Sequence, residues 1–311
     1  MVFLQLFLLA VGFVLLVKGA DWFVDGSSGI ADKFGIPQLV IGLTIVAMGT
    51  SAPETAVSIA AAVKGNADIA VGNVVGSNIL NILIILGISS VITNIAVAKT
   101  TIRYEIPIML LITLFLLLFG VTGESICLWE GIILLVCFAL YLLYMFVMMK
   151  KGEMTAEETE GTKKSVIRLL LIAVFGLVFI IVGSNVTVDA ATALAKIFNI
   201  SEKFIGLTIV ALGTSLPELF TSVVAARKGK ADIAIGNIVG SNIFNILFVL
   251  GTSSLILPIP FELSFVTDCI VAVAAGVVLW LCVFKKKKLT RLDGIIMLVC
   301  YSAYFSYLLL K

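Results

Sequence analysis

Histidine is absent from the 311-residue sequence, and charged residues make up only 13% of it. Without histidine, the chain lacks the commonest proton shuttle and a frequent ligand of transition metals. The five cysteines lie singly in apolar segments without a CxxC pair, so we interpret them as reduced packing residues. The net charge of +2 is too small to indicate a nucleic-acid partner. We find no nucleotide motif or nucleophile arrangement, and therefore expect neither an enzyme nor a permanently bound cofactor.

Apolar residues dominate the chain instead, at 61% of the sequence with a mean hydropathy of +1.20. A soluble domain needs more polar surface, so we predict an all-α integral membrane protein that crosses the bilayer many times. The first apolar run, from Met1 to Val17, has no basic residues before it, which favours a first span over a cleaved signal peptide. Ten runs have the length of a bilayer span, near 2–24, 36–63, 69–92, 104–121, 126–149, 166–188, 200–226, 233–257, 264–284 and 292–310.

An internal repeat organises these runs. Residues 41–90 align with residues 205–254 at a constant offset of 164, without a gap and with 35 identities in 50 positions. A charged stretch, KKGEMTAEETEGTKK, separates the two copies and is interpreted as a solvated linker. We therefore predict a first five-helix repeat over 1–149, a cytoplasmic linker over 150–165 and a second five-helix repeat over 166–311.

Five spans per half is an odd number, so the two halves enter the membrane in opposite directions. The predicted fold is thus ten transmembrane helices arranged as two inverted five-helix repeats. Such folds place their substrate at the membrane midplane, where interrupted helices of the two halves meet. Here the second and seventh helices are expected to be broken.

Each of these two helices has a glutamate inside its apolar run, in the segments GTSAPE (49–54) and GTSLPE (213–218). A carboxylate at membrane depth is costly and indicates a functional site. The proline before each glutamate removes an amide donor and disturbs the helix, which frees carbonyl oxygens nearby. Carboxylate, hydroxyl and carbonyl oxygens together favour a hard cation such as Ca²⁺.

A second polar run follows each glutamate, GNVVGSNILN (72–81) and GNIVGSNIFN (236–245). Side chains four residues apart share one face of a helix, so each run has one polar stripe. We predict that the ends of the stripes ligate ions and that the other asparagines are structural. Glycines spaced four apart would allow these helices to approach their neighbours closely. The predicted ligands from the stripes are Ser77, Asn81, Ser241 and Asn245.

The inverted arrangement brings Glu54 and Glu218 to one central place. Two like charges there cannot both ionise at low cost without cations, and Ca²⁺ or several Na⁺ would neutralise them. The competing interpretation is a pair of protonated glutamates in interhelical hydrogen bonds. Only loaded forms of such a site would cross between inward- and outward-facing states, which is antiport.

These runs resemble the paired repeat motifs of the calcium/cation antiporter superfamily, most closely its sodium/calcium exchanger branch of compact prokaryotic members. The resemblance implies Glu54 and Glu218 as the main Ca²⁺ ligands, with backbone oxygens of Thr50 and Thr214. It also implies flanking Na⁺ sites. Ser51 is added because it is the repeat mate of Ser215, that is, the residue at the equivalent position of the other half. The Na⁺ sites fall on Ala47, Thr50, Ser77 and Glu54 in one half, and on Ala211, Thr214, Ser215, Glu218 and Ser241 in the other.

The resemblance implies exchange of Na⁺ for Ca²⁺ across the membrane, with three Na⁺ for one Ca²⁺ in the family's usual cycle. Some prokaryotic exchangers and the potassium-dependent branch have aspartate at the position of Asn245, so the amide here argues against K⁺ transport. Ca²⁺/H⁺ exchange and K⁺-dependent Na⁺/Ca²⁺ exchange are the close alternatives, and a cation channel is a more distant one. The proton-coupled branch resembles a different pattern, Asn-x-x-x-Glu, which neither copy matches.

Positive charge predicts the orientation. With the N-terminus outside, sixteen lysines and arginines fall on cytoplasmic connections and four on external ones. We therefore expect a multi-pass protein of the cell membrane with both termini extracellular. We also expect it to act as a monomer, because the two halves of one chain supply the internal two-fold symmetry.

Overall fold

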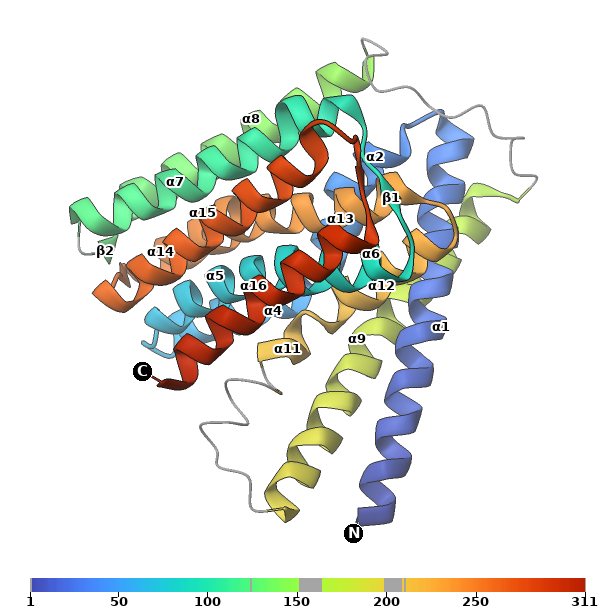
Figure 1. Ribbon diagram of the computed structural model, residues 1–311, viewed down its shortest axis with the longest axis horizontal. Coiled ribbons are helices and arrows are strands. Elements are labelled where there is room, and N and C mark those ends of the chain that lie inside the picture. The colour runs from blue at the N-terminus through green and yellow to red at the C-terminus, as the bar shows by residue number, and fades with distance from the viewer. Residues whose placement is uncertain (1, 124, 151–163, 199–208, 210, 311) are drawn as a thin grey trace.

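A computed structural model describes residues 2–123, 125–150, 164–198, 209 and 211–310 (Figure 1). Over these ranges the fold is helical apart from four two-residue strands. The elements labelled η are π-helical turns that continue the helices beside them. The elements before residue 151 are α1 (Val2–Phe34), α2 (Gln38–Ile41), η1 (Gly42–Val46), α3 (Ala47–Thr50), α4 (Ala52–Val63), α5 (Asp68–Leu80), η2 (Asn81–Leu86), α6 (Gly87–Ile92), β1 (Ile95–Ala96), η3 (Thr101–Glu105), α7 (Ile106–Gly123), β2 (Ser125–Ile126) and α8 (Leu128–Lys150).

The elements after residue 163 follow the same order. They are α9 (Val166–Ile197), α11 (Ala211–Thr214), α12 (Leu216–Arg227), α13 (Ala231–Phe244), η5 (Asn245–Leu250), α14 (Gly251–Ile256), β3 (Ile259–Pro260), α15 (Leu263–Phe284), β4 (Lys288–Leu289) and α16 (Arg291–Leu310).

Eight helices in the described part of the chain are long and apolar enough to cross a membrane, and the bent pair Gln38–Thr50 and Ala52–Val63 makes a ninth. This confirms a multi-span helical membrane protein. The predicted span near 200–226 is the one without such a counterpart, because residues 199–208 and 210 lie outside the described ranges. Most of the predicted linker over 150–165 also lies outside them.

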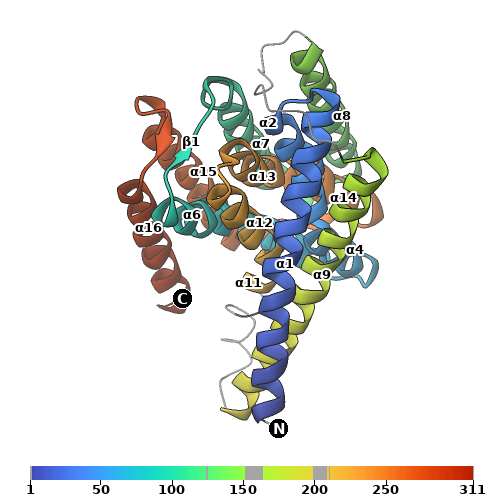
Figure 2. The same ribbon diagram turned by 90° about the vertical axis from the view of Figure 1, so that its right-hand side faces the viewer.

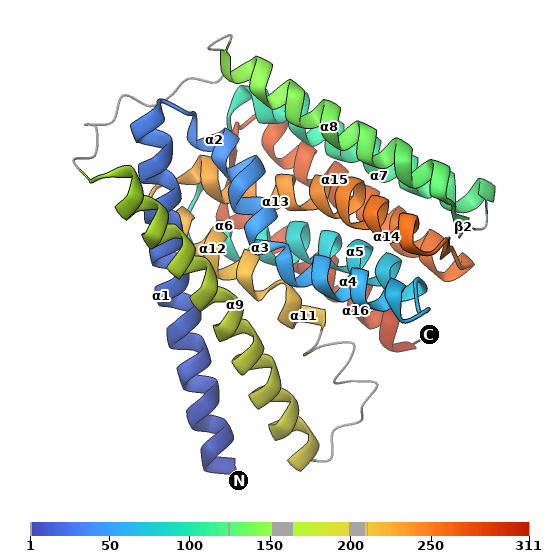
Figure 3. The same ribbon diagram turned by 180° about the vertical axis from the view of Figure 1, so that it is seen from behind.

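Helices α1 and α9 form a long antiparallel pair beside the other helices (Figures 2 and 3). Both run about ten residues beyond the predicted spans of 2–24 and 166–188. Glycines explain the close contact: a Cβ at Gly19 would lie 2.7 Å from the backbone N of Ile180, and one at Gly183 would lie 2.9 Å from the carbonyl O of Gly12. The backbones of α1 and α9 touch from Gly12 to Gly26 of α1, so the two helices are tightly packed over this stretch.

Helices α5 and α13 form the buried centre and carry the two polar stripes. Helix α13 packs against η1, α3 and α12, while α5 packs against α4, η5 and α15. The predicted close approach at spaced glycines is confirmed for Gly236 and Gly240, where a Cβ would lie 3.0 Å and 2.8 Å from atoms of η1 and α3. At their repeat mates, a Cβ on Gly72 would lie 3.5 Å from Phe265 Cε1, and one on Gly76 would meet no described atom within 4 Å, so the prediction is not confirmed there.

The strands join the two halves crosswise. Strand β1 pairs antiparallel with β4, and β2 pairs antiparallel with β3. Strand β1 precedes η3 and α7 whereas β2 follows them, so the two small sheets lie at opposite ends of α7 (Figure 1). Residues of β1 and β3 are repeat mates, which means that equivalent strands of the two halves lie at opposite ends of the molecule.

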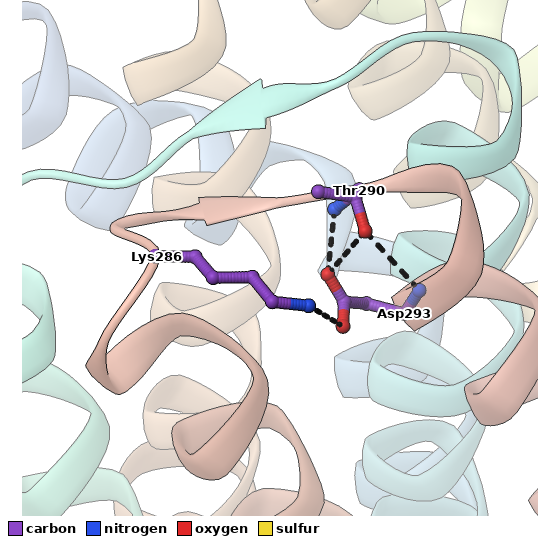
Figure 4. A network of polar contacts seen from close by, with 3 residues as sticks. All are labelled: Lys286, Thr290 and Asp293. Carbon is purple, nitrogen blue, oxygen red and sulfur yellow. Dashed lines mark hydrogen bonds and ion pairs between the residues drawn. The ribbon is translucent and has the colours of Figure 1, made fainter.

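The last helix of each half starts with the same kind of cap. In α16, the backbone N and Oγ1 of Thr290 donate to Asp293 Oδ2 at 2.9 Å and 2.6 Å, and Lys286 pairs with Oδ1 at 3.2 Å (Figure 4). In α8, the backbone N of Cys127 donates to Glu130 Oε2 at 2.7 Å. Thr290 and Cys127 are 163 residues apart, as are Asp293 and Glu130. The repeat therefore extends through the last helix of each half. Equivalent residues there are 163 positions apart, one fewer than the 164 found between residues 41–90 and 205–254.

Candidate cation site

Both predicted helix breaks are present, each at a single serine. Ser51 separates α3 from α4 with φ −80° and ψ 11°, and the two segments bend by 48° (Figure 3). Ser215 separates α11 from α12 with φ −90° and ψ 4°. The proline two residues later has no N–H for the carbonyl four residues before it. In the second half, the hydroxyl of Ser184 donates to that carbonyl, Gly213 O, at 2.7 Å.

The breaks bring the two glutamates together at the centre of the helices. Ser51 Oγ donates to Glu218 Oε1 at 2.8 Å, and Ser215 Oγ donates to Glu54 Oε1 at 3.2 Å. Each carboxylate thus accepts a hydrogen bond from the break in the other half. Both glutamates are buried, at 1% and 0% exposure. They face neither lipid nor bulk water.

Asparagines fix the two polar stripes to each other. Asn81 Nδ2 donates to Asn242 Oδ1 at 2.9 Å, and Asn245 Nδ2 donates to Asn78 Oδ1 at 3.2 Å. The side-chain amides of Asn78 and Asn242 donate to each other's backbone carbonyls at 3.1 Å and 3.2 Å. Asn78 and Asn242 therefore hold α5 against α13, as predicted for structural asparagines. The amide nitrogens of Asn81 and Asn245 are used in the same network, which leaves their oxygens for another role.

Four buried acceptor oxygens at this place have no donor among the described residues: Glu54 Oε2, Glu218 Oε2, Asn81 Oδ1 and Asn245 Oδ1. A buried polar atom without a partner costs about 1–3 kcal/mol, and more when it is charged. These four atoms are two repeat-related pairs, so the same gap occurs in both halves. Carboxylate and amide oxygens are ligands that a hard cation takes, so both halves offer the same kind of donor to an ion.

Asn73 and Asn237 stabilise the broken helices beside the glutamates. Asn73 Nδ2 donates to Glu54 O at 3.2 Å and to Ser58 Oγ at 3.0 Å. Asn237 Nδ2 makes the equivalent contacts with the backbone of Glu218 at 3.4 Å and with a serine hydroxyl at 3.0 Å. Sequence reasoning missed that serine, Ser222, and its repeat mate Ser58. Their positions, four residues after each glutamate, were a signal in both copies.

The other predicted ligands lie around the carboxylates. Ser77 and Ser241 are buried, and their hydroxyls lie 3.4 Å from Ser215 Oγ and from Ala47 O respectively. The hydroxyl of Thr50 lies 3.0 Å from the Oδ1 of Asn237. Thr214 is half-buried, and Ala211 begins the short helix α11.

One feature of the site was not predicted. The π-helical turns η2 and η5 begin at Asn81 and Asn245. Such turns are rare and often mark functional sites, because they interrupt the regular backbone hydrogen bonds.

Within the described ranges, no group of three or more Cys, Asp and Glu could hold a metal. A cation here would therefore need amide, hydroxyl or carbonyl oxygens besides the two carboxylates, which suits Ca²⁺.

One cavity reaches the site from the side of the N-terminus. It has a volume of about 610 Å³ and lies between α4, α9 and α11. Pro53 and Thr214 are among its walls, each next in sequence to a residue of the carboxylate–serine pairs. The cavity therefore adjoins the broken helices on this side, although neither glutamate is among its walls.

The chain also matches the protein-family model described as sodium/calcium exchanger protein, over residues 4–147 and 168–310. The chain belongs to the sodium/calcium exchanger family. It is therefore a member of the calcium/cation antiporter superfamily, a group of transporters, as the paired motifs indicated.

Relatives of this exchanger-family chain match most of its length. It is 31% identical to the sodium/calcium exchanger MaX1 of Methanosarcina acetivorans, in an alignment that covers 98% of this chain and 98% of that one. It is 42% identical to the inner membrane protein YrbG of Escherichia coli, covering 81% of this chain and 79% of that one. Among solved structures, the sodium–calcium exchanger NCX_Mj soaked with 10 mM Na⁺ and no Ca²⁺ superposes with a TM-score of 0.86 at 36% identity. That match covers 98% of this chain and 99% of NCX_Mj.

Proposed function

We propose that the protein is a secondary-active antiporter that exchanges Na⁺ for Ca²⁺ across the cell membrane by alternating access. The observation that carries the proposal is the set of four buried oxygens without donors among the described residues, two on the broken helices and two at the ends of α5 and α13, which pack against them. Two belong to carboxylates and two to amides, and each half of the chain supplies one of each. A hard divalent cation is the ligand that best satisfies such oxygens. Family membership supports the same choice of ions.

In this proposal, Glu54 and Glu218 hold Ca²⁺ in the centre, and neighbouring oxygens complete its coordination. The hydroxyls that now donate to the carboxylates rotate so that their oxygens coordinate Na⁺ when sodium replaces calcium. The remaining proposed ligands of Ca²⁺ or Na⁺ are Ala47, Thr50, Ser51, Ser77, Asn81, Ala211, Thr214, Ser215, Ser241 and Asn245.

Charge supplies the coupling. Two carboxylates with Ca²⁺ give a neutral site, two with three Na⁺ give a net charge of +1, and the empty site has a charge of −2. The empty site is the form that crosses an apolar barrier least readily, because its buried charges lack counterions. Loaded forms therefore switch between the two faces. A three-for-one cycle would move one charge, worth about 2.3 kcal/mol per 100 mV.

We also propose the architecture that this cycle requires: ten spans in two inverted halves, 1–149 and 166–311, joined by a cytoplasmic linker over 150–165. The crosswise pairing of β1 with β4 and of β2 with β3 supports inversion, because repeat mates then lie at opposite ends of the molecule. Both termini are placed outside the cell. The chain works as a monomer, since both halves of the site come from one chain.

Flux measurements in proteoliposomes test the proposal, with gradients of Na⁺, K⁺ and protons imposed one at a time. We expect ⁴⁵Ca²⁺ uptake only when the vesicles contain more Na⁺ than the medium, and faster uptake when an imposed potential makes their interior positive. Vesicles with the Glu54→Gln variant are the control for leakage. Uptake that ignores the Na⁺ gradient would refute the proposal. Uptake driven by a pH jump without Na⁺, or uptake that needs K⁺, would replace it with the corresponding alternative exchanger.

A further inference from the structure

One lysine outside the cation site connects the two halves by ion pairs. Lys228 directly follows α12, and its Nζ lies 2.6 Å from the carboxylates of both Asp21 and Asp25 on α1. The same nitrogen donates to the backbone carbonyl of Asp21 at 3.1 Å. Helix α1 packs along α12 below this contact. The ion pairs therefore fasten the long helix α1 to the helix that bears Glu218.

Partial burial alone would lower the pKa of Lys228, but the hydrogen bonds and charges of Asp21 and Asp25 outweigh it and raise the pKa above the usual lysine value. Lys228 is therefore fully charged at physiological pH, and its contact with α1 is a true ion pair.

The repeat predicts an equivalent contact on the opposite side, and the structure does not have it. Lys64 follows α4 as Lys228 follows α12, and each lysine precedes a glycine with positive φ, Gly65 at 85° and Gly229 at 74°. The mates of Asp21 and Asp25 on α9 are Asn185 and Asp189. Lys64 and Asp189 are both exposed, and no ion pair joins them in this conformation of the described chain.

The packing differs in the same way: the helices are in contact on the side of Lys228 and separated on the side of Lys64. The cavity of about 610 Å³ separates α4 from α9, whereas the equivalent helices α12 and α1 are in contact. Val57 on α4 is 41% exposed, while its repeat mate Thr221 on α12 is fully buried. Thr214 is half-buried at the cavity, while its mate Thr50 is fully buried. The side of the site beside α4 and α9 therefore has a cavity, whereas the side below Lys228 is packed by α1 and α12.

We propose that Lys228, Asp21 and Asp25 form a latch that holds one entrance to the cation site closed, and that Lys64 and Asp189 form the corresponding latch when the other entrance closes. This inference rests on the proposed alternating access, in which the two halves exchange conformations. The second latch has one carboxylate instead of two, because the residue equivalent to Asp21 in the second half is Asn185. The conformation of this structure, closed at Lys228, is therefore the more stable one when the site is empty.

Hydrogen–deuterium exchange of the purified full-length protein, without Na⁺ or Ca²⁺, measures this balance without transport. Lys228→Met removes the positive charge of the latch. The double change Asp21→Asn with Asp25→Asn removes its two negative charges. Arg168 lines the same cavity as both aspartates, so after Lys228→Met it can take the place of the lysine as their partner. The paired aspartate change leaves no such replacement and is therefore the cleaner test. Exposed ion pairs contribute modestly, so we expect exchange over 216–228 to become roughly 2- to 30-fold faster. Arg227→Met is the matched control, since Arg227 is exposed and has no ion pair among the described residues.

A change on the opposite side separates a latch from local loosening. Asn185→Asp adds the missing second carboxylate beside Lys64, so it favours the alternative conformation. We expect faster exchange over 216–228 in this variant too, although the substitution lies on the other side of the molecule. Adding Lys64→Met should abolish that effect, and Asn185→Ala should not produce it.

If Lys228→Met speeds exchange over 216–228 but Asn185→Asp does not, the contact is only a local tether and the inference is wrong. No change in either variant, or faster exchange throughout the protein including 128–150, would also overturn it. These outcomes do not depend on which ions are transported. A failure of Na⁺-driven Ca²⁺ flux would therefore be distinguishable from a failure of the latch.

Discussion

Replacing one central glutamate by glutamine has two opposite effects on stability, which makes it the sharpest test of the site. Glu54→Gln lowers the formal charge of the two central side chains from −2 to −1, at a position where one carboxylate oxygen has no donor among the described residues. A buried polar group without a partner costs about 1–3 kcal/mol, and more when it is charged, so removing one of the two like charges relieves a cost of this order. The variant without ions should therefore be more stable than the wild type, with a melting temperature higher by roughly 2–6 °C.

Calcium should have the reverse effect. Losing one buried charged partner typically weakens binding by about 2–5 kcal/mol, which is at least about 30-fold in affinity. At a Ca²⁺ concentration 100 times the wild-type dissociation constant, binding stabilises the wild type by about 2.7 kcal/mol. A 30-fold weaker variant gains only about 0.9 kcal/mol under the same conditions. The variant is then more stable than the wild type without Ca²⁺ and gains much less from adding it.

Thermal unfolding in detergent, with and without Ca²⁺, measures both effects in one experiment, and Glu218→Gln should behave likewise. Glu105→Gln is the matched control, because Glu105 is also a fully buried glutamate but accepts a hydrogen bond from Tyr144 away from the site. Its Ca²⁺-induced shift should equal that of the wild type. A full Ca²⁺ shift in Glu54→Gln, or an equal loss in Glu105→Gln, would refute the assignment of the site.

Three other substitutions test neighbouring features. Asn245→Asp adds a third carboxylate, so Ca²⁺ flux in proteoliposomes should become dependent on pH or K⁺; unchanged dependence on both would remove Asn245 from the site. Ser184→Ala leaves the carbonyl of Gly213 without its donor, so the free energy of unfolding should fall by about 1–3 kcal/mol; Thr122→Ala, at an exposed helical hydroxyl, is the control and should change little. Gly183→Ala would place a methyl 2.9 Å from Gly12 O, so it should destabilise the protein by about 1–3 kcal/mol and slow flux; an unaltered melting temperature would contradict the tight packing of α1 on α9.

The sequence predicted the breaks and the buried acids because the duplication repeats each signal. One proline-interrupted glutamate is ambiguous, but two at a fixed offset, each followed by an asparagine stripe, specify a shared centre. The structure places the predicted Glu54, Glu218, Asn81 and Asn245 around that centre. The role of these residues as ion ligands stays a prediction.

Other features could not be read from the chain, for identifiable reasons. The exchange of hydrogen bonds between Ser51 and Glu218 depends on how the halves interlock, which no local pattern encodes. The repeat in the last helices was missed because its offset changes to 163, which an ungapped alignment at 164 does not follow. The segments GIILLVC (131–137) and GIIMLVC (294–300) nevertheless carried the signal. The difference between an open and a closed side is a property of one conformation, whereas the sequence is the same in both.

The crosswise pairing of the short strands has a consequence for how the molecule is built. Strand β1 finds its partner only in β4, nearly two hundred residues later, and Asn78 likewise bonds to Asn242. A first half synthesised alone would expose an unpaired strand edge at its surface and unmatched amides within the lipid. Co-expression of the two halves as separate polypeptides could restore both, whereas neither fragment would be a stable membrane protein by itself. Duplication thus produced two modules that have become obligate partners in folding.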